Sequence, residues 1–322
     1  MKYKLSVLLG AACYGILSTI VTKAYGKGYT LGEVVGSQLT TGFLLAWALI
    51  LYMEWKRRRA GTGVDAQNGS STLPVKPAWR QRLILMAAGM PTAITGLLYY
   101  ESLKYIPNSL AILLLFQFTW MGVLIHAIGQ KRRPGGTILL TLAVLLGGTL
   151  LAAGVLEQGW SKFDWLGVLL GLASALSYTL FMLLSGKAVP SVHPAYRSAW
   201  MITGGMLLVF VLFPPSFLFS GALLNGLLPY GFMLGLFGAF LPPVLYAIGV
   251  PRIGEGLTGI LGAVELPVAV LLASTVLHEA VSALQWIGVL LVLLGVALPE
   301  VLRRAGGGRP LTATGDGKGR KR

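Results

Sequence analysis

The sequence carries little charge and almost no cysteine. Only 11% of its 322 residues are charged, against roughly 25% in soluble domains, which argues against a soluble globular fold. Its single cysteine, Cys13, permits no internal disulfide, so a disulfide-stabilised secreted domain is excluded. Hydrophobic residues make up 55% of the chain and form long runs between short basic segments. This pattern predicts an all-α integral membrane protein.

Ten apolar runs are long enough to cross a bilayer, which takes roughly 20 residues per helix. They cover approximately residues 5–23, 31–55, 83–103, 109–128, 137–156, 165–186, 199–219, 227–250, 257–277 and 284–301. The first run resembles a lipoprotein signal ending at Cys13, but it continues to about Thr22 and has Gly10 where a lipobox has Leu. We therefore interpret it as the first membrane span.

Basic residues predict the orientation. The net charge of +15 would suggest nucleic acid in a soluble protein, but here the charge lies between the apolar runs. With a cytoplasmic N-terminus, 22 of the 26 Lys and Arg residues fall on the cytoplasmic side, as the positive-inside rule requires. We expect a multi-pass protein of the cytoplasmic membrane with both termini cytoplasmic, surrounded by lipid and without a nucleic-acid partner.

An internal repeat divides the chain. Leu98–Leu114 resembles Leu245–Leu261 at an offset of 147 residues. We expect a first five-helix repeat over residues 1–160, with a flexible cytoplasmic loop at 56–82, and a second over 161–302. Residues 303–322 are expected to form a disordered basic cytoplasmic tail. Because five is odd, the second repeat enters the membrane inverted, so the predicted fold has ten transmembrane helices as two inverted five-helix repeats.

Inverted repeats are typical of secondary transporters that work by alternating access. A membrane sensor or a membrane enzyme remains an alternative. The sequence has no G-x-x-x-x-G-K-[ST] or G-x-S-x-G motif, so we expect no enzymatic activity and no cofactor. We expect no metal site either, because the neighbouring residues His278 and Glu279 have no third metal-ligating residue to complete a site.

Prolines in equivalent helices indicate a cavity. Pro91 lies in the third apolar run, and Pro242 and Pro243 lie in the eighth. Proline bends a helix and frees backbone carbonyl groups, which can line a substrate path. The alternative is that membrane helices simply tolerate proline. Six further cavity candidates share a polar tip or an aromatic face: Tyr14, Gln38, Gln117, Trp120, Tyr178 and Tyr246.

Two carboxylates within the apolar runs need an explanation, because ionisable groups in a membrane cost about 3 kcal/mol by insertion scales. Glu265 lies in an apolar run, two residues before Pro267. It is either a proton carrier, since apolar surroundings favour a neutral carboxyl group, or a hydrogen-bonded structural residue. Glu101 lies close to Tyr99 and either faces the mouth of the cavity or pairs with Lys104 at the interface.

The ends of the two halves carry the pattern of a known family. "VPRIGEG" (residues 250–256) precedes Glu265 and Pro267, and Gln285, Gly288 and Gly295 follow. Over residues 1–302 the chain resembles the EamA family of the drug/metabolite transporter superfamily. Gln38 stands where the family often has Arg, and Leu266 separates Glu265 from Pro267, two residues that are commonly adjacent in the family.

The resemblance implies a ten-helix secondary transporter that moves a small organic metabolite, such as an amino acid, outward. Efflux of cationic compounds or drugs is the alternative substrate class. The resemblance does not carry over the proton-coupled mechanism of the four-helix relatives, because the first run has no carboxylate in its middle. We expect a monomer or a homodimer.

Overall fold

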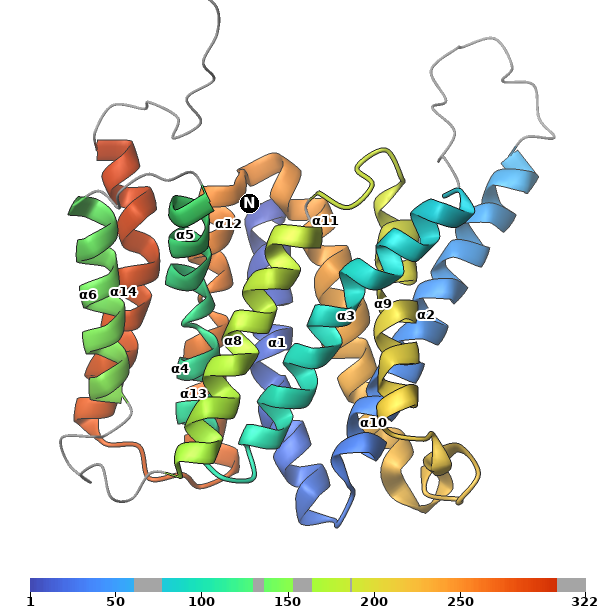
Figure 1. Cartoon of the computed structure of the whole chain (residues 1–322), viewed down its shortest axis with the longest axis horizontal. Helices are drawn as coiled ribbons and strands as arrows, with labels where there is room; N and C mark the ends of the chain where they lie inside the picture. The colour runs from blue at the N-terminus through green and yellow to red at the C-terminus, as the bar shows by residue number, and fades with distance from the viewer. Residues whose placement is uncertain (61–76, 130–135, 153–163, 186, 306–322) are drawn as a thin grey trace, which may run out of the picture.

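The computed structural model describes residues 1–60, 77–129, 136–152, 164–185 and 187–305 (Figure 1). Every regular element within these residues is helical. Six helical stretches are long and apolar enough to cross a membrane, and four further apolar helices are shorter. The all-helical membrane architecture predicted from the sequence is therefore confirmed.

The helices of the first half are α1 (Lys2–Gly26), α2 (Leu31–Ala60), α3 (Trp79–Ser102), α4 (Asn108–Leu115), α5 (Phe118–Gly129) and α6 (Gly136–Ala152). Those of the second half are α8 (Trp165–Ser185), α9 (Pro194–Leu212), α10 (Leu228–Leu234), α11 (Leu241–Ile253), α12 (Glu255–Gly262), α13 (Glu265–Val276) and α14 (Ala283–Ala305). A short 3₁₀ helix, η2 (Ser216–Leu218), and two π-helical segments, η3 (Leu223–Leu227) and η4 (Gly235–Phe240), lie between α9 and α11.

The seventh apolar run was placed wrongly at both ends, because α9 begins at Pro194 and ends at Leu212. Proline is favourable at a helix start, where its missing N–H is not needed. His193 caps this start, since its side chain accepts a hydrogen bond from the backbone N–H of Ala195. The paired prolines 214 and 215 cannot continue the helix at its other end.

The predicted loop at 56–82 is shorter in the structure, because α2 continues to Ala60 and α3 begins at Trp79. The rest of this loop, residues 61–76, lies outside the described residues. The helix α14 likewise extends to Ala305, three residues into the predicted tail. Residues 306–322 of that tail lie outside the described residues.

The bundle is arranged as a broad row of helices (Figure 1). At one side α6 packs along α14, and at the other side α2 packs against α9 and α10. Between them, α3 packs on α8, while α1 packs on α11 and on both α12 and α13. The N-terminus, the end of α2 and the end of α14 all lie at the top of Figure 1.

Glycines allow close helix approach in the bundle, as is common in membrane proteins. A Cβ atom built on Gly89 of α3 would collide with the backbone of Met201 in α9. In the contact of α6 with α14, a Cβ atom on Gly148 would lie 2.9 Å from the backbone nitrogen of Val292. A Cβ atom on Gly295 would lie 2.8 Å from Cδ2 of Leu145. Both helix pairs therefore depend on residues without a side chain.

Candidate functional site

Two broken helices meet in the middle of the bundle. The fourth apolar run is divided into α4 and α5, and the ninth into α12 and α13. The second break directly precedes Glu265, whereas the first, at Phe116–Gln117, has neither Pro nor Gly. The sequence did not predict the first break, because the expected interruptions were based on prolines. The available signal was the polar Gln117 in an otherwise apolar run.

Gln117 connects the first break to its surroundings and is buried. Its Nε2 donates to the carbonyl oxygen of Leu113 over 2.8 Å and to Oγ1 of Thr149 in α6 over 2.7 Å. Its Oε1 accepts from the indole Nε1 of Trp120 over 2.7 Å. The amide is thus bonded at both ends, which stabilises the break because unpaired polar groups in a membrane interior are costly.

Prolines act differently in the third and eighth runs. Pro91 lies inside α3, which continues through it as a single helix. The carbonyl oxygen of Pro91 accepts from the hydroxyls of Thr95 and of Ser177 in α8, both over 2.8 Å. In the eighth run, Pro242 lies in the first turn of α11, directly after the π-helical segment η4. Only the eighth run is interrupted at its prolines.

Glu265 is the first residue of α13 and is half-buried within the bundle. Its side chain makes no hydrogen bond or ion pair with any residue that the structure describes. Tyrosines from four other chain segments lie within electrostatic range of its carboxylate: Tyr14 of α1, Tyr99 and Tyr100 of α3, Tyr178 of α8 and Tyr246 of α11. The carboxylate of Glu265 therefore has five phenol groups within electrostatic range.

The helix α1 packs directly on the second break. A Cβ atom on Gly15 would lie 2.7 Å from the carbonyl oxygen of Glu265, so only glycine fits there without a shift. One residue earlier, the ring of Tyr14 lies 6.2 Å from that of Tyr246. The helix α8 reaches the first break in a related way, because the hydroxyl of Thr179 donates to the carbonyl oxygen of Phe118 over 3.3 Å.

Several buried polar atoms of α1, α2 and α3 have no hydrogen-bond partner among the described residues. The buried hydroxyls of Ser18 and Tyr99 are neighbours within range of a weak hydrogen bond, but neither meets hydrogen-bond geometry with any described residue. The hydroxyl of Thr19 and Oε1 of Gln38 are also unpaired among the described residues. The Gln38 amide faces Tyr100. Such unused capacity is uncommon in buried regions and points to a ligand or water.

Comparisons with known proteins agree with this architecture. Residues 165–299 match the EamA-like transporter family. The threonine/homoserine exporter RhtA of Salmonella typhimurium is 28% identical over 215 residues, covering 65% of this chain and 68% of the exporter. An uncharacterized transporter of Synechocystis, sll1319, is 26% identical over 317 residues, covering 91% and 92% of the two chains.

This part of the chain is similar to the EamA-like transporter family, as the sequence resemblance indicated. The family match and the transporter relatives are consistent with the drug/metabolite transporter superfamily. A solved crystal structure shares the fold of this transporter, with a TM-score of 0.61 and 18% identity over 95% of this chain and 98% of the other.

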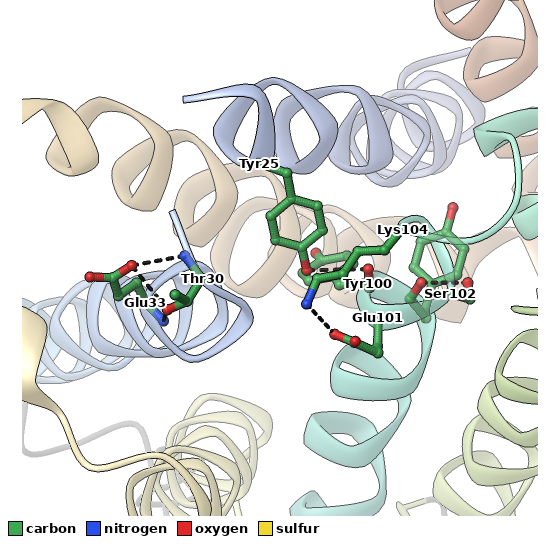
Figure 2. Close-up of polar contacts among 8 residues, drawn as sticks. Tyr25, Thr30, Glu33, Tyr100, Glu101, Ser102 and Lys104 are labelled. Carbon is green, nitrogen blue, oxygen red and sulfur yellow. Dashed lines mark hydrogen bonds and ion pairs between the residues drawn. The ribbon is translucent and has the colours of Figure 1, made fainter. Parts of the chain in front are cut away.

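Glu101 lies in the last turn of α3, beside Lys104 (Figure 2). Its carboxylate forms an ion pair with Lys104, with 2.7 Å between Oε2 and Nζ. The Lys104 ammonium group also lies 5.3 Å from the ring centre of Tyr25. Tyr25 in turn donates to the carbonyl oxygen of Tyr100 over 3.2 Å. This geometry matches the interfacial alternative for Glu101.

Glu279 has a structural contact that the sequence did not indicate. The backbone N–H groups of Asn108 and Ser109 donate to its carboxylate over 2.7 and 3.1 Å. The Ser109 hydroxyl adds a third bond of 2.8 Å. The turn after α13 thereby caps the N-terminus of α4. Among the described residues, no group of three or more His, Cys, Asp or Glu residues could hold a metal ion.

Proposed function

We propose that the chain is a secondary transporter that moves a small organic metabolite across the cytoplasmic membrane, outward and by alternating access. The RhtA relatives are threonine/homoserine exporters, which supports an amino acid or similar solute and the outward direction. The observation that carries the proposal is the pair of broken helices beside Glu265, since broken helices mark substrate sites in transporters.

The proposal includes ten membrane spans in two inverted repeats. In support, α12 begins 147 residues after α4, and α13 begins 147 residues after α5. The sequence offset of the repeat is the same. The six long and four shorter apolar helical stretches also sum to ten when each broken helix is taken as one span.

Packing between α6 and α14 supports a twofold relation. Gly148 faces Val292, and Gly295 faces Leu145. At the repeat offset of 147, Gly148 corresponds to Gly295 and Leu145 corresponds to Val292. Exchange of the two halves therefore turns the Gly148–Val292 contact into the Gly295–Leu145 contact. Such reciprocal contacts are expected when a twofold axis relates two elements. They favour inverted repeats over an accidental sequence resemblance.

We propose that the described conformation is closed at the end that carries Glu279. There α4 packs on α13, and the Glu279 carboxylate caps α4. The twofold-related pair, α5 and α12, makes no comparable packing within the described residues. Alternating access requires such an asymmetry, because one end must open while the other closes. The positive-inside pattern assigns the closed end to the outer side.

Purified protein in liposomes tests the transport proposal. Vesicles loaded with a labelled mixture of amino acids should lose particular compounds faster than protein-free vesicles, and an excess of the same unlabelled compound should accelerate the exchange. A membrane enzyme would convert a compound without moving it, and a sensor would do neither. Either of these results with a broad metabolite mixture would contradict the transport proposal.

The role of Glu265 is tested by comparing Glu265→Gln with Glu265→Ala. Gln keeps the size and hydrogen-bonding ability of the side chain but carries no proton between the two sides. If Glu265 is a proton carrier, both variants lose the pH dependence of flux. If it is a structural residue, Glu265→Gln keeps pH-dependent flux and Glu265→Ala lowers the amount of folded protein.

A further inference from the structure

The surroundings of Glu265 carry information about the substrate's charge. The apolar runs contain no Lys or Arg between their ends: none occurs at residues 5–22, 83–103, 163–186, 198–251 or 253–302. An anionic group near Glu265 would find a carboxylate and no basic partner from these runs. A cationic group would supply the opposite charge that Glu265 lacks among the described residues.

The ring arrangement also suits a cation. Tyr14, Tyr178 and Tyr246 are half-buried rather than fully covered, and all three lie within electrostatic range of Glu265. They come from three different helices, and the rings of Tyr14 and Tyr246 lie 6.2 Å apart. Aromatic rings attract ammonium groups through their negative faces, and rings around a cation form a common recognition site.

The unpaired polar atoms supply hydrogen-bond acceptors. Oε1 of Gln38 can only accept hydrogen bonds, and the hydroxyl oxygens of Ser18 and Tyr99 can accept as well as donate. Ser18 and Tyr99 are only 2% and 6% exposed, so bulk water does not satisfy them. An ammonium group has three donors and no acceptor, which matches this set of oxygens.

We propose that Glu265 and the surrounding tyrosines form a subsite for the ammonium group of the substrate, so that the transporter takes amines and amino acids in preference to neutral or anionic solutes. This inference rests on the proposed transport function and names its substrate class. Glu265 binds the charge, the rings of Tyr14, Tyr178 and Tyr246 surround it, and the oxygens near α1 and α3 accept its hydrogen bonds.

Matched probes test the subsite on the full-length protein in detergent. Phenylethylamine, phenylalanine, 2-phenylethanol and 3-phenylpropionate share a phenyl tail and differ in the head group. Butylamine, norvaline, 1-butanol and pentanoate repeat the series with a smaller tail. Thermal-shift and calorimetric titrations should detect the amines and amino acids in at least one series. Equal affinity for an alcohol or a carboxylate of the same series would overturn the proposal.

Variants locate the binding. Glu265→Gln should weaken amine binding about tenfold or more, because a charge-assisted hydrogen bond is lost. Glu33→Gln removes the same charge at the outer end of α2, where Glu33 bonds to Thr30, and should leave amine binding unchanged. A folded Glu265→Gln protein with unchanged amine affinity contradicts the subsite.

A second pair of variants covers the case in which Glu265→Gln does not fold. Tyr246→Phe keeps the aromatic face, whereas Tyr246→Leu removes it, so Leu should weaken amine binding about threefold or more relative to Phe. Equal affinities of these two variants for amines would count against the subsite.

Liposome flux separates this inference from the transport proposal. If amines bind but are not transported, the subsite proposal stands and the transport proposal is contradicted. If solutes are transported and no amine or amino acid competes with them, the transport proposal stands and the subsite proposal is contradicted. If no probe binds and no solute moves, both proposals fall.

Discussion

The carboxylate of Glu279 bonds to the backbone N–H of Asn108 over 2.7 Å, across 171 positions of sequence. This contact joins the turn after α13 to the start of α4, and it therefore connects the two halves of the transporter. A comparable carboxylate contact occurs within one half, where Glu33 accepts from the backbone N–H of Thr30 over 2.8 Å at the start of α2.

Replacement of Glu279 by Ala should loosen α4. The loss of a helix cap costs about 1 kcal/mol, and here it also removes a bond between the halves. Hydrogen exchange followed by mass spectrometry should show faster exchange at residues 108–112. The matched control, Glu33→Ala, should speed exchange at the start of α2 and leave α4 protected. Unchanged protection of α4 in the Glu279→Ala protein would show that this contact does not hold the closed end.

Gly15→Ala should lower both stability and flux. Its Cβ atom would lie 2.7 Å from the carbonyl oxygen of Glu265, and the backbone must shift because that oxygen is not the end of a flexible side chain. Overpacking of this kind costs about 1–3 kcal/mol. Gly96→Ala is the control, since nothing lies within 4 Å of its Cβ position. Melting temperature and liposome flux report the difference, and equal behaviour of the two variants would be evidence against the close contact.

Two adjacent glycines of α6 should respond differently to alanine. Gly148 faces the backbone nitrogen of Val292 at 2.9 Å, whereas Gly147 faces open space. Gly148→Ala should lower the melting temperature, and Gly147→Ala should leave it unchanged or raise it slightly, since alanine favours helix. Gly295→Ala should have an intermediate effect, because its neighbour is the movable side chain of Leu145. The reverse order for residues 147 and 148 would contradict the packing of α6 on α14.

Gln117 should be a structural residue of the first break. Gln117→Leu leaves the indole N–H of Trp120 and the hydroxyl of Thr149 without their present partner, at about 1–3 kcal/mol for an unsatisfied buried group. Thr149→Val should cost less stability in this variant than in the unmodified protein, because the Thr149 hydroxyl then bonds only to the carbonyl oxygen of Leu145. A double-mutant cycle of melting temperatures measures this coupling. Additive effects would mean that the bond of 2.7 Å between the two side chains contributes nothing.

The sequence predicted the membrane class and the approximate position of most helices, because apolar runs of about 20 residues leave few alternatives. It also selected Pro242 as a position where proline bends a helix, and the structure changes from the π-helical segment η4 to α11 there. It did not predict the break at Phe116–Gln117, which contains no helix-breaking residue and depends on the bonds of Gln117 to Thr149 and Trp120. Such bonds form only between folded helices, so local sequence does not show them.

The candidate site was predicted unevenly for the same reason. Tyr14, Tyr178 and Tyr246 were selected for their aromatic faces, and all three lie within electrostatic range of Glu265. Pro91 was selected because proline bends a helix and frees carbonyl groups, and α3 continues through it as a single helix. The sequence could not predict the cap by Glu279, because its partners lie 170 and 171 residues away in the chain. Long-range polar contacts carry no periodicity that a single sequence could reveal.

The position of Cys13 has a practical consequence. It is the only thiol of the chain, it is half-buried, and it lies within electrostatic range of Tyr14 and Tyr246. A membrane-impermeant maleimide applied to one face of sealed vesicles would thus label a single atom beside the candidate site. The natural protein already contains the reporter for a side-specific accessibility experiment, and no cysteine has to be removed or introduced first.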